Sequence, residues 1–325
     1  MGLKDKILSN KTVQRFSHWA QTTSLPGFQK VPVWDVCRLL YYEWMEGNIG
    51  VRANSMAFSF FLSLFPALIL LVSLVPYIPI ANFDTILYNF IFEFLPQSTE
   101  EWLGETIKDL SMIQRGNLLS LSFLLMVYFS SNGVMNMMTG FEKSFDTTFK
   151  TRNFFEKRFI AIWLTGLLFL FMVSSVIMVI SSDFILNYIF TYLIKAQYFR
   201  PLITMANWCL TFLIFYSMVA VIYRYAPPFR KKTGYLTPGT TLATVLIIAT
   251  SLGFAFYVNN FGSYNKIYGS IGAVIVMMVW IELNCFILLI GFEINASIAL
   301  NRDLGTINDY SALKRNNKRD YLNTK

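Results

Sequence analysis

Long apolar segments separated by short polar ones dominate this sequence. Six stretches are long enough to cross a bilayer as helices: 53–80, 118–140, 159–181, 202–223, 237–258 and 270–296. A helix rises 1.5 Å per residue, so about 20 apolar residues cover ~30 Å of hydrocarbon. The pattern therefore predicts an all-α polytopic membrane protein with six transmembrane helices.

The basic residues change side in step with these stretches. Of the 27 lysines and arginines, 22 lie before the first stretch, between the second and third, between the fourth and fifth, or after the sixth. Basic residues near the ends of a span resist translocation, so these segments are expected in the cytoplasm. Both chain termini should therefore be cytoplasmic.

The composition argues against a water-soluble globule. Hydrophobic residues make up 55% of the chain and charged residues only 14%, against about 25% charged in a soluble domain. The net charge of +8 is explained by the basic loops and their attraction to anionic lipid headgroups, so no nucleic-acid partner is expected.

Three regions follow from this organisation. Residues 1–52 form a cytoplasmic or interfacial N-terminal segment, residues 53–300 the transmembrane domain, and residues 301–325 a basic cytoplasmic tail. The spacing of apolar residues over 34–45 predicts an amphipathic helix, which either lies in the headgroup plane or packs on the bundle. The outer segment 81–117 is acidic and predicts two further amphipathic helices.

Sequence features of an enzyme are nearly absent. His18 is the only histidine, and the three cysteines are too scattered for a zinc site of the usual spacing. No glycine-rich loop ends in the Gly-Lys-Ser/Thr that binds nucleotide phosphates. We therefore expect no catalytic activity, no metal and no cofactor.

Polar residues inside the sixth stretch are the better candidates for function. Glu282 and Glu293 are eleven residues apart, which is three helical turns, so they lie on nearly the same face, about 16 Å apart. Asn295 adds an amide close to Glu293. Each polar group costs free energy in hydrocarbon and tends to face the interior of a bundle.

A second polar stripe descends the second stretch. Asn132, Asn136 and Lys143 follow one another at helical spacing, and Lys143 should reach the same boundary as Glu293. An ion pair between Lys143 and Glu293 is therefore expected. The stripe is interpreted either as part of a pathway through the bundle or as interhelical hydrogen bonds that hold the bundle together.

Helix-breaking residues mark two further positions. Pro66 lies inside the first stretch, where it removes a backbone hydrogen bond and predicts either a packing kink or a hinge. Between the fifth and sixth stretches, Gly269 and Gly272 belong to a glycine- and asparagine-rich segment, 259–272, that predicts a re-entrant or tightly packed turn rather than a free loop.

Four segments carry a resemblance to a known family. They are 51–71, with an Arg-Ala opening and a Leu-Phe-Pro core; 130–159; 222–246, with a Pro-Gly landmark; and 260–296, with Tyr-Gly-Ser-Ile-Gly and Gly-x-Glu-x-Asn-Ala. Together they resemble the YihY/BrkB family of bacterial inner-membrane proteins, once mislabelled as ribonuclease BN. Glu293 and Asn295 match the family pattern, whereas Glu282 departs from it.

The resemblance implies a six-helix protein of the bacterial inner membrane whose activity is poorly defined and in which transport is suspected. The old nuclease label does not fit, because a histidine-rich metal cluster cannot be built from one histidine. The leading hypothesis is a transporter or flippase-like protein for lipid or an amphiphilic solute. The alternative is a non-transporting scaffold that organises envelope partners. Membrane lipids are the expected partners, and a homo-oligomer is compatible with the sequence.

Overall fold

The computed structural model describes residues 18–46, 48–74, 116–143, 145, 147–192, 200–260 and 263–304. Its main helices are α3 (Val33–Glu46), α4 (Ile49–Leu74), α7 (Gly116–Gly140), α8 (Phe154–Tyr192), α9 (Arg200–Tyr225), α10 (Pro238–Asn260) and α11 (Ser263–Leu304). All except α3 contain a segment long and apolar enough to cross a membrane, which makes six. The predictions of an all-α fold and of six transmembrane helices are confirmed.

Where the structure describes the residues, the bounds of the predicted stretches agree with the helices to within a few residues, except in α8 and α11. The predicted end of the first stretch, 75–80, lies outside the described residues. Helix α8 continues to Tyr192, well past the predicted end at 181. Helix α10 continues to Asn260 and helix α11 begins at Ser263, so any turn is shorter than the predicted 259–272, and Gly269 and Gly272 lie inside α11. Water does not compete for backbone hydrogen bonds in a bilayer, so glycine interrupts a helix there less readily than in a soluble protein.

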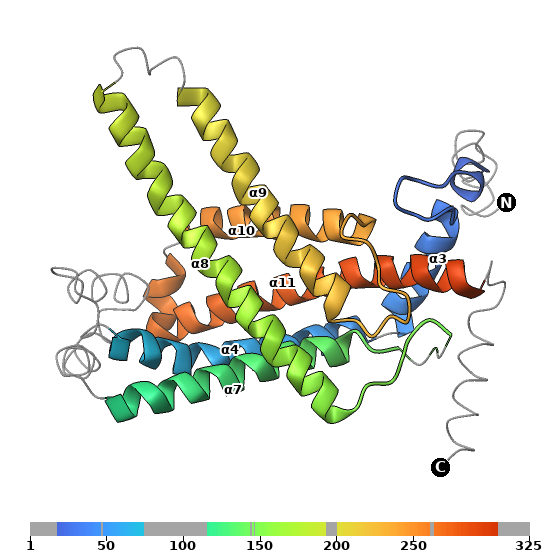
Figure 1. Ribbon diagram of the computed structural model, residues 1–325, viewed down its shortest axis with the longest axis horizontal. Helices are drawn as coiled ribbons and strands as arrows, with labels where there is room; N and C mark the ends of the chain where they lie inside the picture. The colour runs from blue at the N-terminus through green and yellow to red at the C-terminus, as the bar shows by residue number, and fades with distance from the viewer. Residues whose placement is uncertain are drawn as a thin grey trace.

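The six spanning helices are arranged in a closed ring. In the order α4, α7, α8, α9, α10, α11 and back to α4, each packs against the next. Figure 1 shows α8 and α9 running together and crossing the other helices obliquely. At one end of the bundle, α4, α8 and α10 begin and α7, α9 and α11 terminate. We call it the basic end, because Arg52, Lys143 and the cations of 150–158 and 224–232 lie there.

Helix α3 packs on the bundle at the basic end. Val36 is buried with Phe28 and Val31 against Ile298 of α11. Large side chains on other faces of α3, such as Tyr41, remain exposed. The amphipathic helix expected over 34–45 is therefore present, and it contacts the C-terminal part of α11.

Two loops at the basic end fold together into a platform, 147–153 with 226–237. Phe149 and Phe229 form the single antiparallel bridge among the described residues. Arg152 donates hydrogen bonds to three carbonyls at the end of α9, those of Tyr225, Ala226 and Pro227. These carbonyls have no partner within the helix, so the guanidinium caps α9. Burial lowers the pKa of Arg152 from its usual value.

Several expectations fall on segments outside the described residues. These are the two amphipathic helices of the outer segment, within 81–115, and the basic tail after Leu304. The residues from 301 to 304 continue α11, so the helix extends slightly past the predicted end of the transmembrane domain.

Candidate functional site

Four charged side chains form a buried cluster at the basic end. Glu293 of α11 is 0% exposed, and each of its carboxylate oxygens accepts from a cation: Oε1 from Arg52 Nη2 at 2.7 Å and Oε2 from Lys143 Nζ at 2.5 Å. Lys143 Nζ also lies 3.1 Å from Oε2 of Glu43 in α3. The order Glu43, Lys143, Glu293, Arg52 alternates in sign, and the formal charges cancel.

The cluster joins four separate elements. Arg52 opens α4 and also donates from Nη1 to the carbonyl of Gly140, the last residue of α7, at 2.7 Å. The Lys143 side chain is 6% exposed, so its charge is removed from water almost as completely as that of Glu293. A buried charge is tolerated only when it is paired and hydrogen-bonded. Each charged side chain of this cluster is paired with an opposite charge on the next one.

The expected ion pair between Lys143 and Glu293 is thus present, and sequence reasoning missed its two neighbours. Its position next to the first predicted stretch marks Arg52 only as a flanking cation. The Arg-Ala opening of that span was the signal, because an arginine one turn inside an apolar helix needs a carboxylate. Glu43 carries a similar signal, because it follows Val36 by seven residues and so falls on the apolar face of α3, where it is buried.

Asn295 belongs to the same motif as Glu293 but contacts a different helix. Its Oδ1 accepts a hydrogen bond from the backbone N–H of Gly239 at 3.1 Å, one of the N–H groups at the start of α10. A Cβ on Gly239 would lie 2.6 Å from this oxygen and would overlap the carbonyl of Gly291. The backbones of α10 and α11 therefore approach too closely for any residue except glycine.

Aromatic rings fill the space next to the ion cluster. Phe292 stacks on Phe141, with ring centroids 4.5 Å apart, and lies 6.1 Å from Phe229 of the platform. The fully buried Tyr223 donates from its hydroxyl to the carbonyl of Leu288 at 2.8 Å. The ends of α7, α9 and α11 are thus packed together, and the one hydroxyl on these rings, that of Tyr223, has a hydrogen-bond acceptor.

The two asparagines of the polar stripe in α7 do not reach the glutamates of α11. Asn136 Nδ2 donates to Ser59 Oγ of α4, and Asn132 Oδ1 accepts from Arg158 Nη1 of α8. Both bonds are interhelical, which is one of the two interpretations of the stripe. A role for Asn132, Asn136 or the glutamates along a pathway stays a prediction.

Glu282 has a different environment from Glu293. It is half-buried, and the amide of Asn54, turned so that its nitrogen donates, lies 2.6 Å from Glu282 Oε1. Asn54 follows Arg52 by two residues, which is about 200° around α4, so the two side chains point to opposite sides of the helix. Arg52 contacts Glu293 and Asn54 contacts Glu282, so the start of α4 lies between the two carboxylates. Among the described residues, no lysine or arginine is within ion-pair distance of Glu282.

The predicted hinge or packing residues lie within helices. Pro66 is buried inside α4, where the carbonyl of Leu62 lacks its usual helical donor. Gly272 is buried in α11, and Gly269 lies one turn before it. In the part of the chain that the structure describes, no group of three or more His, Cys, Asp or Glu side chains is placed to hold a metal ion.

A family model and two relatives all describe similar proteins. A family model described as Virulence factor BrkB matches residues 40–315. A putative ribonuclease-like protein, YfkH, of Bacillus subtilis is 28% identical over 278 residues, which cover 83% of this chain and 96% of the relative. A UPF0761 membrane protein of Xanthomonas campestris is 24% identical over 82% of this chain, and the match covers 61% of that protein's length. No solved structure gives a significant match.

Proposed function

The chain belongs to the Virulence factor BrkB family of membrane proteins, and from this membership and the geometry of its bundle we propose that it moves a lipid or another amphiphilic solute across or within the bilayer. In this proposal the protein resides in the bacterial inner membrane with its basic end at the cytoplasmic surface. The concentration of lysine and arginine at that end supports this orientation.

The exposure of α11 carries the proposal. Between Val274 and Leu283 the large side chains are 37–44% exposed at positions 274, 275, 277, 279, 280 and 283. At 100° per residue these positions point in every direction around the helix. A helix in a solidly packed bundle exposes one face to lipid, so this part of α11 is also uncovered on the side that faces the other helices. The side chains are apolar, which suits an acyl chain.

The same helix is almost fully buried at the basic end. From Leu289 to Leu300, all but two residues are buried, and the ion cluster and the aromatic rings surround them. The bundle is therefore closed at the basic end and more open along the middle of α11. That difference is the asymmetry expected of one state of an alternating-access protein.

The order of charges in the cluster offers a way to open that end. Loss of the contact between Lys143 and Glu293 divides the cluster into two neutral pairs, Glu43 with Lys143 and Arg52 with Glu293. Each pair keeps its own salt bridge, so no unpaired charge is left buried. We propose that this contact is the latch at the closed end.

A flux assay in liposomes tests the proposal. Vesicles that contain the purified protein and a fluorescent phospholipid are treated with a membrane-impermeant quencher, and amphiphilic solutes are assayed in parallel. The native protein should accelerate lipid or solute movement over empty vesicles. Glu293→Gln should reduce the rate at an unchanged level of inserted protein, because the closed state loses its latch.

Glu142→Gln is the matched control, because Glu142 is half-exposed and, among the described residues, forms a salt bridge only with Lys157 at the same end. It should leave flux unchanged. No flux above empty vesicles across a broad set of substrates would contradict the proposal, and a stoichiometric co-purifying partner would then favour the scaffold.

We also propose that the chain is not an enzyme. The ribonuclease-like name belongs to the relative from Bacillus subtilis. The single histidine of this chain, His18, supports a non-enzymatic role here.

A further inference from the structure

The platform at the basic end carries two exposed lysines, Lys231 and Lys232, that no carboxylate binds closely among the described residues. Residues 225–237 include Arg230, Lys231 and Lys232 and no acidic residue. Lys231 Nζ lies 3.9 Å from Asp303, whose carboxylate is bound more closely by Arg302 at 2.8 Å. Among the described residues, no carboxylate lies within ion-pair distance of Lys232, whose ammonium group lies 4.9 Å from the ring centroid of Tyr225.

Two tyrosine rings lie against two of the cations at this end, Lys232 and Arg224. The hydroxyls of Tyr225 and Tyr235 are 3.4 Å apart, and the guanidinium of Arg224 lies 4.3 Å from the Tyr235 ring centroid. The hydrogen bond with Tyr225 raises the pKa of Tyr235, so this hydroxyl stays a donor. One of the two O–H groups donates to the other, so Lys232 and the tyrosine pair together offer an ammonium group and one remaining O–H donor at this surface.

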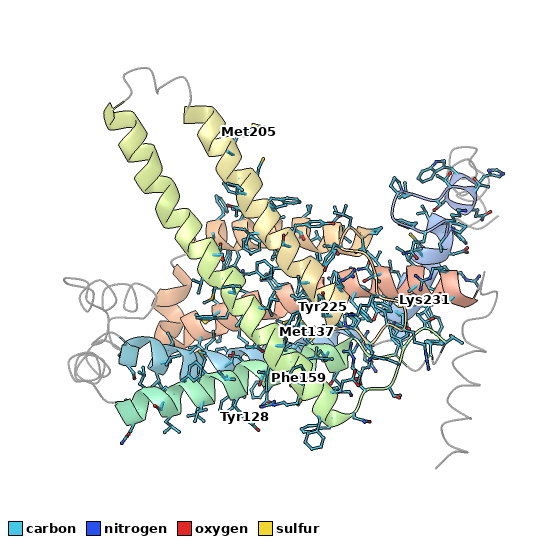
Figure 2. The ribbon with its side chains drawn as sticks, viewed as in Figure 1. Tyr128, Met137, Phe159, Met205, Tyr225 and Lys231 are labelled. Atoms are coloured by element: carbon cyan, nitrogen blue, oxygen red, sulfur yellow. The ribbon has the colours of Figure 1, made fainter. Side chains whose placement is uncertain are left out.

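An apolar stripe leads to the same place along α8. Phe155 and Phe159 are 83% and 74% exposed, and they share a helix face with Trp163, whose ring contacts Tyr225 at 5.0 Å. In Figure 2, Phe159, Tyr225 and Lys231 come from three segments at the same end of the molecule. Leu236 of the platform is 81% exposed as well.

We propose that this surface binds an anionic phospholipid of the adjacent leaflet. The phosphate contacts Lys231, Lys232 and the hydroxyl of Tyr235, while an acyl chain lies along Phe159 and Trp163. Aromatic residues and lysines are both favoured at the headgroup level of a bilayer, and anionic lipid supplies the charge that the platform lacks. The binding does not depend on transport, so it goes beyond the function proposed above.

The test is lipid binding by the full-length protein in zwitterionic nanodiscs or detergent, with phosphatidylglycerol as the probe. Affinity is measured by native mass spectrometry and by the rise in melting temperature. The double variant K231Q/K232Q should bind phosphatidylglycerol roughly 25-fold more weakly, since each lysine near an anionic surface contributes about fivefold. Binding of phosphatidylcholine should not change.

The matched control is K150Q/K157Q, which removes the same charge from the same end. Lys150 pairs with Glu156 at 2.7 Å and Lys157 with Glu142 at 2.5 Å, so these lysines are already neutralised. The charge-retaining K231R/K232R should bind as the native protein does, which separates loss of charge from misfolding.

Three results would overturn the proposal. An equal loss of affinity in K150Q/K157Q would indicate diffuse attraction rather than a site. Binding of inorganic phosphate as tight as that of phosphatidylglycerol would indicate an anion site that does not distinguish a lipid headgroup from free phosphate. Unchanged phosphatidylglycerol affinity in K231Q/K232Q would exclude the platform.

Discussion

Lys143 Nζ and Glu293 Oε2 lie 2.5 Å apart, although 150 positions separate the two residues in the chain. One follows α7 and the other belongs to α11, helices that are not neighbours in the ring. Their ion pair lies beside the stacked rings of Phe141 and Phe292, where the ends of these two helices meet. Because both charges are buried, the pair should matter for stability more than a surface ion pair does.

Glu293→Gln should lower the stability of the protein by about 3 kcal/mol, because removing one partner of a buried pair leaves the other uncompensated. The melting temperature of the purified protein in detergent measures the effect. Glu142→Gln should cost ~1 kcal/mol or less, since its pair with Lys157 is partly exposed. Equal losses in the two variants would show that the cluster contributes no more than a surface pair.

Glu282→Gln should behave in the opposite way. Glu282 faces the neutral amide of Asn54, and a glutamine carbonyl accepts the same hydrogen bond. The substitution removes a charge from a spanning helix without leaving a buried cation unpaired, so stability should be equal or higher. Chemical-denaturant unfolding in detergent distinguishes the cases. A loss as large as that of Glu293→Gln would reveal a cationic partner for Glu282.

Hydropathy and charge were enough to predict the six helices, because a span of about 20 apolar residues has no other stable form in lipid. The pair between Lys143 and Glu293 was also predictable, since both residues fall at the same depth. The partnership of Arg52 with Glu293 was not, because it depends on which helices adjoin in the ring. The depth of a residue in the membrane can be predicted from one sequence, whereas the order of the helices around the ring cannot.

The segment 259–272 shows a different limit. Its glycines and asparagines are typical of turns in water, yet α11 starts at Ser263 and includes Gly269 and Gly272. The Pro-Gly landmark, Pro238-Gly239, gives no sign of helix packing in the sequence, although Gly239 allows the close approach of α10 to α11. Local composition does not tell whether a glycine serves a turn or a helix contact.

Gly239→Ala should destabilise the protein by several kcal/mol, since its Cβ would overlap the Gly291 carbonyl and the helices would have to separate. The loss should appear as a lower melting temperature and a smaller yield of monodisperse protein. Gly253→Ala, in the same helix, is the control: a Cβ there meets nothing within 4 Å. It should leave stability unchanged or raise it by up to ~1 kcal/mol through helix propensity. Similar losses from both would mean that α10 and α11 do not approach at Gly239.

Arg152→Lys should weaken the basic end even though it keeps the charge. The guanidinium donates to three carbonyls at the end of α9, and a lysine ammonium on a flexible stem cannot reproduce that planar arrangement. We expect a loss of about 2 kcal/mol, the scale of a hydrogen bond to a charged group. Faster hydrogen exchange should be confined to the last turn of α9 and to 226–233. Lys150→Arg, two residues away in an exposed pair with Glu156, should change neither quantity. If exchange in α9 stayed at the native rate in Arg152→Lys, the cap would contribute nothing that a lysine cannot supply.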